Sequence, residues 1–230
     1  VRLRHLPSEQ SQSPRPGTSL LAVLQGGLSD SSLGHFLRKL RELGSRADTQ
    51  VIVAAVGCSR DERSALALVA AVRQNVRVVP FEANESFAFV VNRALPLVER
   101  DVLVVIDPRA GFTPEGAFAL AETVRSSRNA VVMPVAQAAN WSIHSAGASL
   151  VGPKRIPAPI LPGHPLGDVA SLPALIEIPL LDERSFAIST TRLREVGGLD
   201  PILTNEFSLE ALSLALRRSD PDVRLVLATH

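Results

Sequence analysis

The segment DVLVVIDPR, residues 101–109, gives the clearest indication of how this chain folds. Its first part, residues 101–106, is a short run rich in Val and Ile, which is the composition of a strand buried on both faces. The run leads directly into one carboxylate, Asp107, and one cation, Arg109, with a proline between them. We therefore predict a buried strand that ends where Asp107 and Arg109 begin.

The same kind of strand recurs along the chain and alternates with helices. Further apolar runs occur at residues 19–24, 50–56, 76–80 and 130–135. Helical spacing of apolar residues at 32–43, a capping-box sequence before 61–74 and a Thr-Pro pair at 113–114 indicate helices between these strands. This order predicts an α/β fold with a mostly parallel sheet flanked by helices.

Two regions depart from this alternation. Residues 1–18 hold several Arg, Pro, Ser and Gln residues, which predicts a mobile arm or linker. Residues 131–181 contain eight of the seventeen prolines and only four charged residues, which predicts a loop-rich lobe without long helices. After it we expect strands at 185–189 and 222–228, and helices at 191–196 and 207–218.

Composition narrows the classes of protein. The 230 residues are 46% hydrophobic and 20% charged, and the net charge of +1 gives no reason to expect nucleic acid as a partner. The single cysteine, Cys58, excludes an internal disulfide and fits a reducing compartment. No apolar run approaches the ~20 residues that span a bilayer, so a soluble cytoplasmic domain without a transmembrane segment is expected.

Common catalytic signatures do not occur. The Gly26-Gly27 pair follows the first predicted strand, but neither the dinucleotide fingerprint nor the P-loop sequence is present. Residues 24–30 contain no basic side chain, which argues against a nucleotidyltransferase. The five histidines do not share a helix at metal-ligand spacing. Cys58 is interpreted as a small buried thiol rather than a nucleophile.

Several segments instead form a recognisable series. They are NESFAFVVNRAL (84–95), VLVVID (102–107), LREVGGLD (193–200), NEFSLEALSLALR (205–217) and the final ATH (228–230). In order and spacing they resemble conserved segments of family 2, GT-A-type glycosyltransferases, over nearly all of residues 19–230. The resemblance implies a Rossmann-like GT-A domain, with residues 19–135 as the nucleotide-binding half and 136–230 as the acceptor-side half.

The resemblance also implies a chemistry. Such enzymes bind a nucleotide sugar over the carboxyl ends of the strands, and Mg²⁺ or Mn²⁺ held by a D-x-D motif neutralises the departing diphosphate. An aspartate on a later helix removes the proton of the acceptor hydroxyl. Asp107, Arg109, Asn84 and Asn92 become candidates for donor binding. Metal candidates are Asp107 and His230.

This chain departs from the family pattern at its acidic positions. The D-x-D motif reads Asp107-Pro108-Arg109, and the loop that normally carries two aspartates reads AVGCS (55–59). The base position is Ala211, which leaves Glu210, one residue earlier, as the candidate base. That shift turns a side chain by about 100° around a helix of ~3.6 residues per turn.

The remaining candidates lie on the acceptor side. They are Gly197, Gly198, Asp200 and Trp141, whose ring either stacks on a sugar or anchors the lobe to the core. Two functions stay open. One is a glycosyltransferase that takes a UDP-, GDP- or dTDP-sugar with altered or impaired metal-dependent catalysis. The other is a non-catalytic GT-A domain that binds or assembles with further domains or a second copy, for which no metal is needed.

Overall fold

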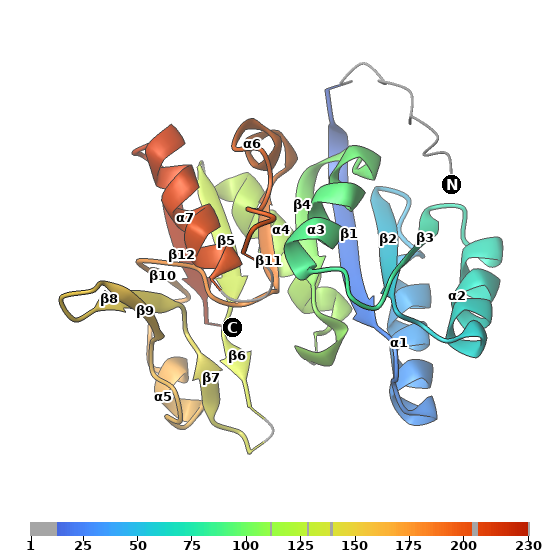
Figure 1. The fold of residues 1–230 in the computed structure, drawn as a ribbon, viewed down its shortest axis with the longest axis horizontal. Coiled ribbons are helices and arrows are strands. Elements are labelled where there is room, and N and C mark those ends of the chain that lie inside the picture. The colour runs from blue at the N-terminus through green and yellow to red at the C-terminus, as the bar shows by residue number, and fades with distance from the viewer. Residues whose placement is uncertain (1–12, 111, 128, 139, 204–206, 230) are drawn as a thin grey trace.

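The structure is a computed structural model that describes residues 13–110, 112–127, 129–138, 140–203 and 207–229. Most of the predicted arm therefore lies outside the described residues, as does His230. Among the described residues, eight strands form one sheet in the order β10-β12-β5-β11-β4-β1-β2-β3 (Figure 1). Their bounds are β10 (Leu175–Glu177), β12 (Arg224–Ala228), β5 (Ala130–Pro134), β11 (Phe186–Ser189), β4 (Arg100–Ile106), β1 (Arg15–Gln25), β2 (Thr49–Val56) and β3 (Val76–Phe81).

The sheet is mostly parallel, as predicted. β1 runs parallel to both of its neighbours, β2 and β4, and β12 runs parallel to β5. The exceptions are β11, which is antiparallel to both β4 and β5, and β10, which is antiparallel to β12. Since β11 runs against its neighbours, its first residues lie at the edge where β4 and β5 end.

Helices cover both faces of the sheet (Figure 1). On one face α1 (Asp30–Leu43), α2 (Arg60–Val72) and α4 (Pro114–Ser126) pack on alternate residues of the strands, among them Leu20 and Leu24 of β1. On the other face α3 (Phe87–Ala94), α6 (Thr190–Glu195) and α7 (Ser208–Ser219) pack on the intervening residues, among them Leu21 and Val23. The strands are thus apolar on both faces, which is why they appear in the sequence as continuous apolar runs.

Side chains predicted to begin helices do so. The Ser59 hydroxyl caps α2 and its third residue, Glu62, completes the capping box. Thr113 caps α4, with Pro114 in the first turn. Two further serines that were not identified from the sequence, Ser29 and Ser86, cap α1 and α3. None of the described helices is both long enough and apolar enough to span a membrane.

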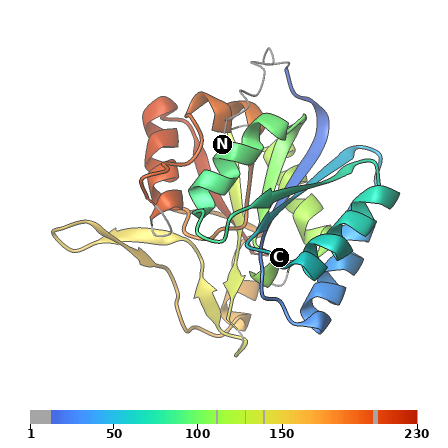
Figure 2. The same cartoon turned by 45° about the vertical axis from the view of Figure 1, so that its right-hand side comes forward.

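The proline-rich region forms the predicted lobe without long helices. It contains two hairpins, β6 (Ala136–Gln137) with β7 (Ile143–Ser145) and β8 (Ala148–Val151) with β9 (Ile156–Pro159), followed by the single helical turn α5 (Gly167–Ala170). Figure 2 shows the β8–β9 hairpin reaching away from the sheet. The lobe leaves the sheet at the carboxyl end of β5.

One predicted boundary is wrong. β1 begins at Arg15, so residues 15–18 belong to the sheet and not to an arm. The backbone N–H of Gly17 donates to Asp101 Oδ1 at 3.0 Å, and Thr18 is buried. The register shifts between Arg15 and Thr18. A bulge of this kind accommodates Pro16, which lacks an N–H donor, and Gly17, whose φ is +131°.

Candidate functional site

Asp107 and Arg109 lie at the carboxyl end of β4, in the middle of the sheet. The Asp107 N–H donates to Ser185 Oγ at 3.1 Å, and Asp107 Oδ1 accepts from the Arg109 N–H at 3.0 Å. The carboxylate therefore braces its own turn, which is the 3₁₀ turn η2 (Pro108–Ala110). The exposed Arg109 guanidinium donates to Gln25 Oε1 at the end of β1. A cation thus lies across the ends of the two central parallel strands.

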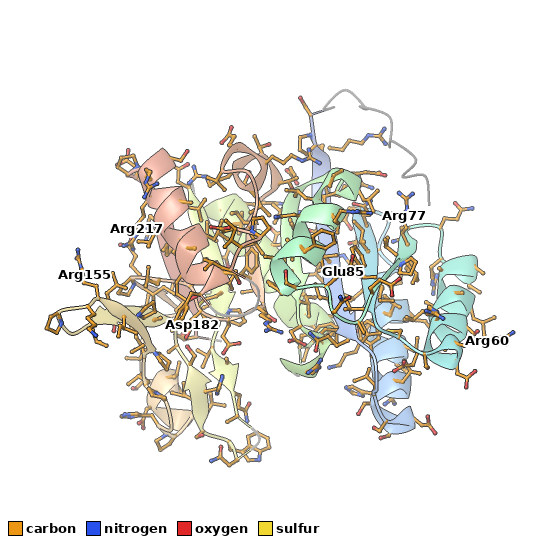
Figure 3. The ribbon with its side chains drawn as sticks, viewed as in Figure 1. Arg60, Arg77, Glu85, Arg155, Asp182 and Arg217 are labelled. Atoms are coloured by element: carbon orange, nitrogen blue, oxygen red, sulfur yellow. The ribbon has the colours of Figure 1, made fainter. Side chains whose placement is uncertain are left out.

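A pair of carboxylates, Asp182 and Glu183, lies near this point, just before β11. Asp182 accepts a hydrogen bond from the Ser145 hydroxyl, at the end of β7. Glu183 Oε1 is 3.6 Å from Nε2 of His144, and its side chain is only 21% exposed. Figure 3 shows Asp182 where the lobe meets the body of the domain. These contacts tie the lobe to the sheet through acidic side chains.

Burial is the main influence on the ionisation of these carboxyl groups. The pKa of Glu183 is raised to about 7, mainly by burial and then by the charge of Asp182; Asp107 adds to the rise, while His144 and Arg184 oppose it. Burial also raises the pKa of Asp182, against the hydrogen bond from Ser145. A carboxyl group with a pKa near 7 exchanges a proton readily at neutral pH, and such groups concentrate at functional sites.

Glu210, the candidate base, joins this acidic group. It is half-buried in the first turn of α7, and its pKa is raised by burial and then by the charge of Asp182. The charge of Asp182 therefore acts on the Glu210 carboxyl group. On the same helix the buried Ser213 Oγ accepts from the Leu181 N–H at 2.9 Å and so fixes the backbone next to Asp182.

Asn92 and Asn84, both predicted to bind the donor, lie in different surroundings. Asn92 Oδ1 accepts from the Leu199 N–H at 2.8 Å, and Asn92 Nδ2 donates to the Leu199 carbonyl at 2.7 Å. Both polar groups of its side chain are therefore engaged by the turn after α6. Asn84 is exposed in the turn that follows β3. We place Asn84, and not Asn92, among residues free to meet a ligand.

Three of the four acceptor-side candidates lie together. Gly197, Gly198 and Asp200 line a groove of about 440 Å³ between the turn after α6 and helix α7. Ala211, which the sequence resemblance aligns with a catalytic base, lines the same groove. Trp141 is elsewhere, after β6 in the lobe, and is 75% exposed. The alternative in which Trp141 anchors the lobe to the core is therefore wrong.

The loop after β1 is closed by Glu62, the acidic residue of the capping box of α2. Glu62 Oε1 accepts from the N–H groups of Gly27 and Leu28 at 3.0 and 3.1 Å, and Oε2 accepts from the Ser59 N–H at 2.6 Å. Burial opposes its ionisation, but these hydrogen bonds outweigh burial and lower its pKa. The neighbouring Cys58 is buried, and burial raises its pKa to about 11, as expected for a thiol that is not a nucleophile.

Comparison with solved structures identifies this architecture. A crystal structure of GalNAc-T7 with UDP, GalNAc and Mn²⁺ superposes with a TM-score of 0.68 at 12% identity, over 95% of this chain and 43% of that one. S. aureus TarS 1-349 superposes with a TM-score of 0.55 at 11% identity, over 92% of this chain and 60% of that one. The chain has a GT-A glycosyltransferase fold.

At 12% and 11% sequence identity, the similarity to these two structures shows the fold alone. The chain spans less than two thirds of the length of either GT-A structure. No protein-family model matches it, and no curated protein matches its sequence.

The GT-A fold raises the question of whether these residues suit a divalent cation. One carboxylate oxygen of Asp107 already accepts a hydrogen bond from the backbone of its own turn. The charged side chain next to it is the Arg109 guanidinium, a cation. Within the described part of the chain, no three His, Cys, Asp or Glu residues are grouped so as to hold a metal. His230, a metal candidate, lies outside the described residues. Several carboxylates lie at this edge, but no three of the described side chains are placed to bind one ion, so they do not form the donor set that Mg²⁺ or Mn²⁺ prefers.

Asp182 and Glu183 were missed because the motifs of the resemblance do not include them. A signal was present in the sequence: Asp182-Glu183-Arg184 is a charged triplet between two apolar runs, Leu180-Leu181 and the predicted strand at 185–189. Charged residues next to a buried strand indicate a site when they lie at the edge of the sheet where the parallel strands end.

Proposed function

We propose that this GT-A domain is related to family 2 glycosyltransferases and binds a nucleotide sugar at the carboxyl edge of β1 and β4, with altered metal-dependent catalysis. The observation that carries the proposal is the Arg109 guanidinium, which lies across the ends of these strands beside Asp107. A planar guanidinium forms paired hydrogen bonds with phosphate oxygens. It thereby supplies positive charge to a diphosphate leaving group without a divalent cation.

The carboxyl groups at the same edge as Arg109 support a second step of such a reaction, the removal of the proton from the acceptor hydroxyl. An acceptor hydroxyl needs a base, and Ala211 cannot provide one. Glu183 and Glu210 are the carboxyl groups that lie toward Asp182, and burial raises the pKa of each. Glu183, with a pKa of about 7, is suited to accept a proton near neutral pH, and Glu210 is the second candidate for this role.

The alternative is a non-catalytic GT-A domain that binds or assembles with other domains or a second copy. The observation that favours it is the groove lined by Ala211, Leu212 and Leu214, which is apolar where the family places its base. Nucleotide-sugar binding distinguishes the two functions.

Thermal unfolding with UDP-, GDP- and dTDP-sugars tests the proposal. We expect at least one of them to raise the melting temperature in EDTA, with no further increase on adding Mn²⁺. Arg109→Ala should weaken that ligand about tenfold, since a hydrogen bond to a charged group contributes about 1.5 kcal/mol. The affinity is measured by isothermal titration calorimetry.

Arg77→Ala is the matched control, because Arg77 is an exposed arginine on β3, toward the opposite end of the strands. It should leave the affinity unchanged. A stabilisation that requires Mn²⁺ would contradict the altered metal dependence. If no nucleotide sugar stabilises the protein, donor binding is wrong and the non-catalytic domain is the better description.

A further inference from the structure

Trp141 is the only tryptophan of the chain, and it is presented to solvent. Its side chain is 75% exposed, and its backbone has a φ of +63°. This left-handed conformation costs a non-glycine residue about 1 kcal/mol, and such residues gather where function requires them. A large aromatic ring that is both exposed and held in a strained turn is suited to contact a ligand.

The backbone on both sides of Trp141 is fixed by the lobe. Its N–H donates to the Ala138 carbonyl at 3.1 Å, and its own carbonyl accepts from the Leu166 N–H at 3.3 Å. The next residue, Ser142, forms a bridge with Pro165. The ring is therefore carried by a turn that is bonded to Ala138, the residue after β6, on one side and to Leu166, before α5, on the other.

The polar groups around this turn are amide, hydroxyl, imidazole and carboxylate groups. Asn140 Oδ1 accepts from the N–H and the hydroxyl of Ser142 at 3.3 and 2.7 Å. Across the bridge, His164 Nδ1 lies 3.3 Å from Asp168 Oδ2, and both side chains are about half exposed. The sequence contains no Lys or Arg from residue 129 to residue 153.

This combination discriminates between classes of ligand. An anionic membrane surface attracts Lys and Arg beside aromatic residues, and those cations do not occur in this stretch. A sugar ring has an apolar face of C–H groups that covers an indole, and hydroxyl groups around its rim that bond amide, carboxylate and imidazole side chains. The groups around Trp141 match the second description.

The lobe also lies on the appropriate side of the domain. It follows the carboxyl end of β5. Both β4 and β5 are antiparallel to β11, so β4 and β5 run in the same direction, which β12 shares. The lobe and Asp107 therefore lie at the same edge of the sheet. An acceptor that reaches the donor site at this edge has the lobe next to it.

We infer that Trp141 is a stacking platform for a sugar ring of an oligosaccharide acceptor, with Asn140, Ser142, His164 and Asp168 as the polar groups beside it. This inference rests on the proposed glycosyltransferase function, and it names the acceptor class as a neutral glycan of several sugars.

Fluorescence of the single tryptophan reports on this residue alone. Cellohexaose, chitohexaose, xylohexaose and maltohexaose are titrated into the protein without any nucleotide sugar. We expect a saturable blue shift with at least one of them. By calorimetry, Trp141→Ala should weaken that glycan about tenfold, and Trp141→Phe should retain most of the affinity, as expected from the contribution of aromatic stacking. Leu150→Ala, a partly exposed apolar residue of the same lobe, should bind normally.

The outcomes separate this inference from the proposed function. If none of the four glycans shifts the emission, the stacking site is wrong, whatever nucleotide sugars do. A shift with vesicles of phosphatidylcholine and phosphatidylglycerol, without one for glycans, overturns it in favour of a lipid surface. If a glycan binds and no nucleotide sugar does, the glycan site is supported and the transferase function is wrong.

Discussion

Replacing Gly198 by alanine is expected to lower the free energy of unfolding by about 3 kcal/mol. Gly198 has a φ of +83°, and a Cβ built on it lies 2.2 Å from Asn92 Oδ1. The methyl group therefore strains the backbone and also displaces the Asn92 amide. Asn92 loses two hydrogen bonds with Leu199, each of which contributes about 1 kcal/mol. Denaturant unfolding measures the change.

Gly197→Ala is the matched control for this substitution. Gly197 has nearly the same φ, +81°, but a Cβ there meets nothing within 4 Å. It should cost only the backbone strain, about 1 kcal/mol. Equal losses in the two variants would show that Asn92 does not clamp the turn. The difference between the two losses in unfolding free energy thus measures the contribution of the Asn92–Leu199 hydrogen bonds, which connect α3 to the wall of the groove.

The regular part of the fold was predictable because its strands are buried on both faces. Residues 101–106 carry no polar alternation, and such runs are recognisable wherever helices separate them. Residues 15–18 were not recognised, because Pro16 and Gly17 occupy a bulge whose composition is that of a loop. Tertiary pairing with β4, and not local preference, makes these residues part of a strand.

The candidate site was only partly predictable, for a reason of topology. Asp107 and Arg109 follow a strand directly, so a parallel sheet places them at its carboxyl edge. Asp182 and Glu183 precede β11, and they reach the same edge because that strand is antiparallel. No apolar pattern distinguishes the direction of a buried strand. Asn92 shows the opposite case, where a residue assigned to ligand binding by resemblance is engaged by Leu199.

Glu183→Gln is expected to stabilise the protein above neutral pH by about 3 kcal/mol relative to the parent chain. The pKa of Glu183 is raised from 4.5 to about 7, mainly by burial. Between these values the folded state binds more protons than the unfolded state, so the free energy of unfolding falls as pH rises from about 4.5 to about 7. Glutamine stays neutral and does not suffer this loss. Denaturant unfolding at pH 5, 6, 7 and 8 follows the difference.

The two curves should coincide near pH 5 and diverge up to about pH 8, which identifies ionisation of Glu183 as the cause rather than altered packing. Glu195→Gln, an exposed carboxylate on α6, should run parallel to the parent chain. His144→Ala removes the charge that opposes the rise in the pKa of Glu183, so it should steepen the loss. A constant offset for Glu183→Gln at every pH would contradict the assignment. Glu183 would then be an ordinary ionised carboxylate, and a proton-accepting role at this edge would fall to Glu210.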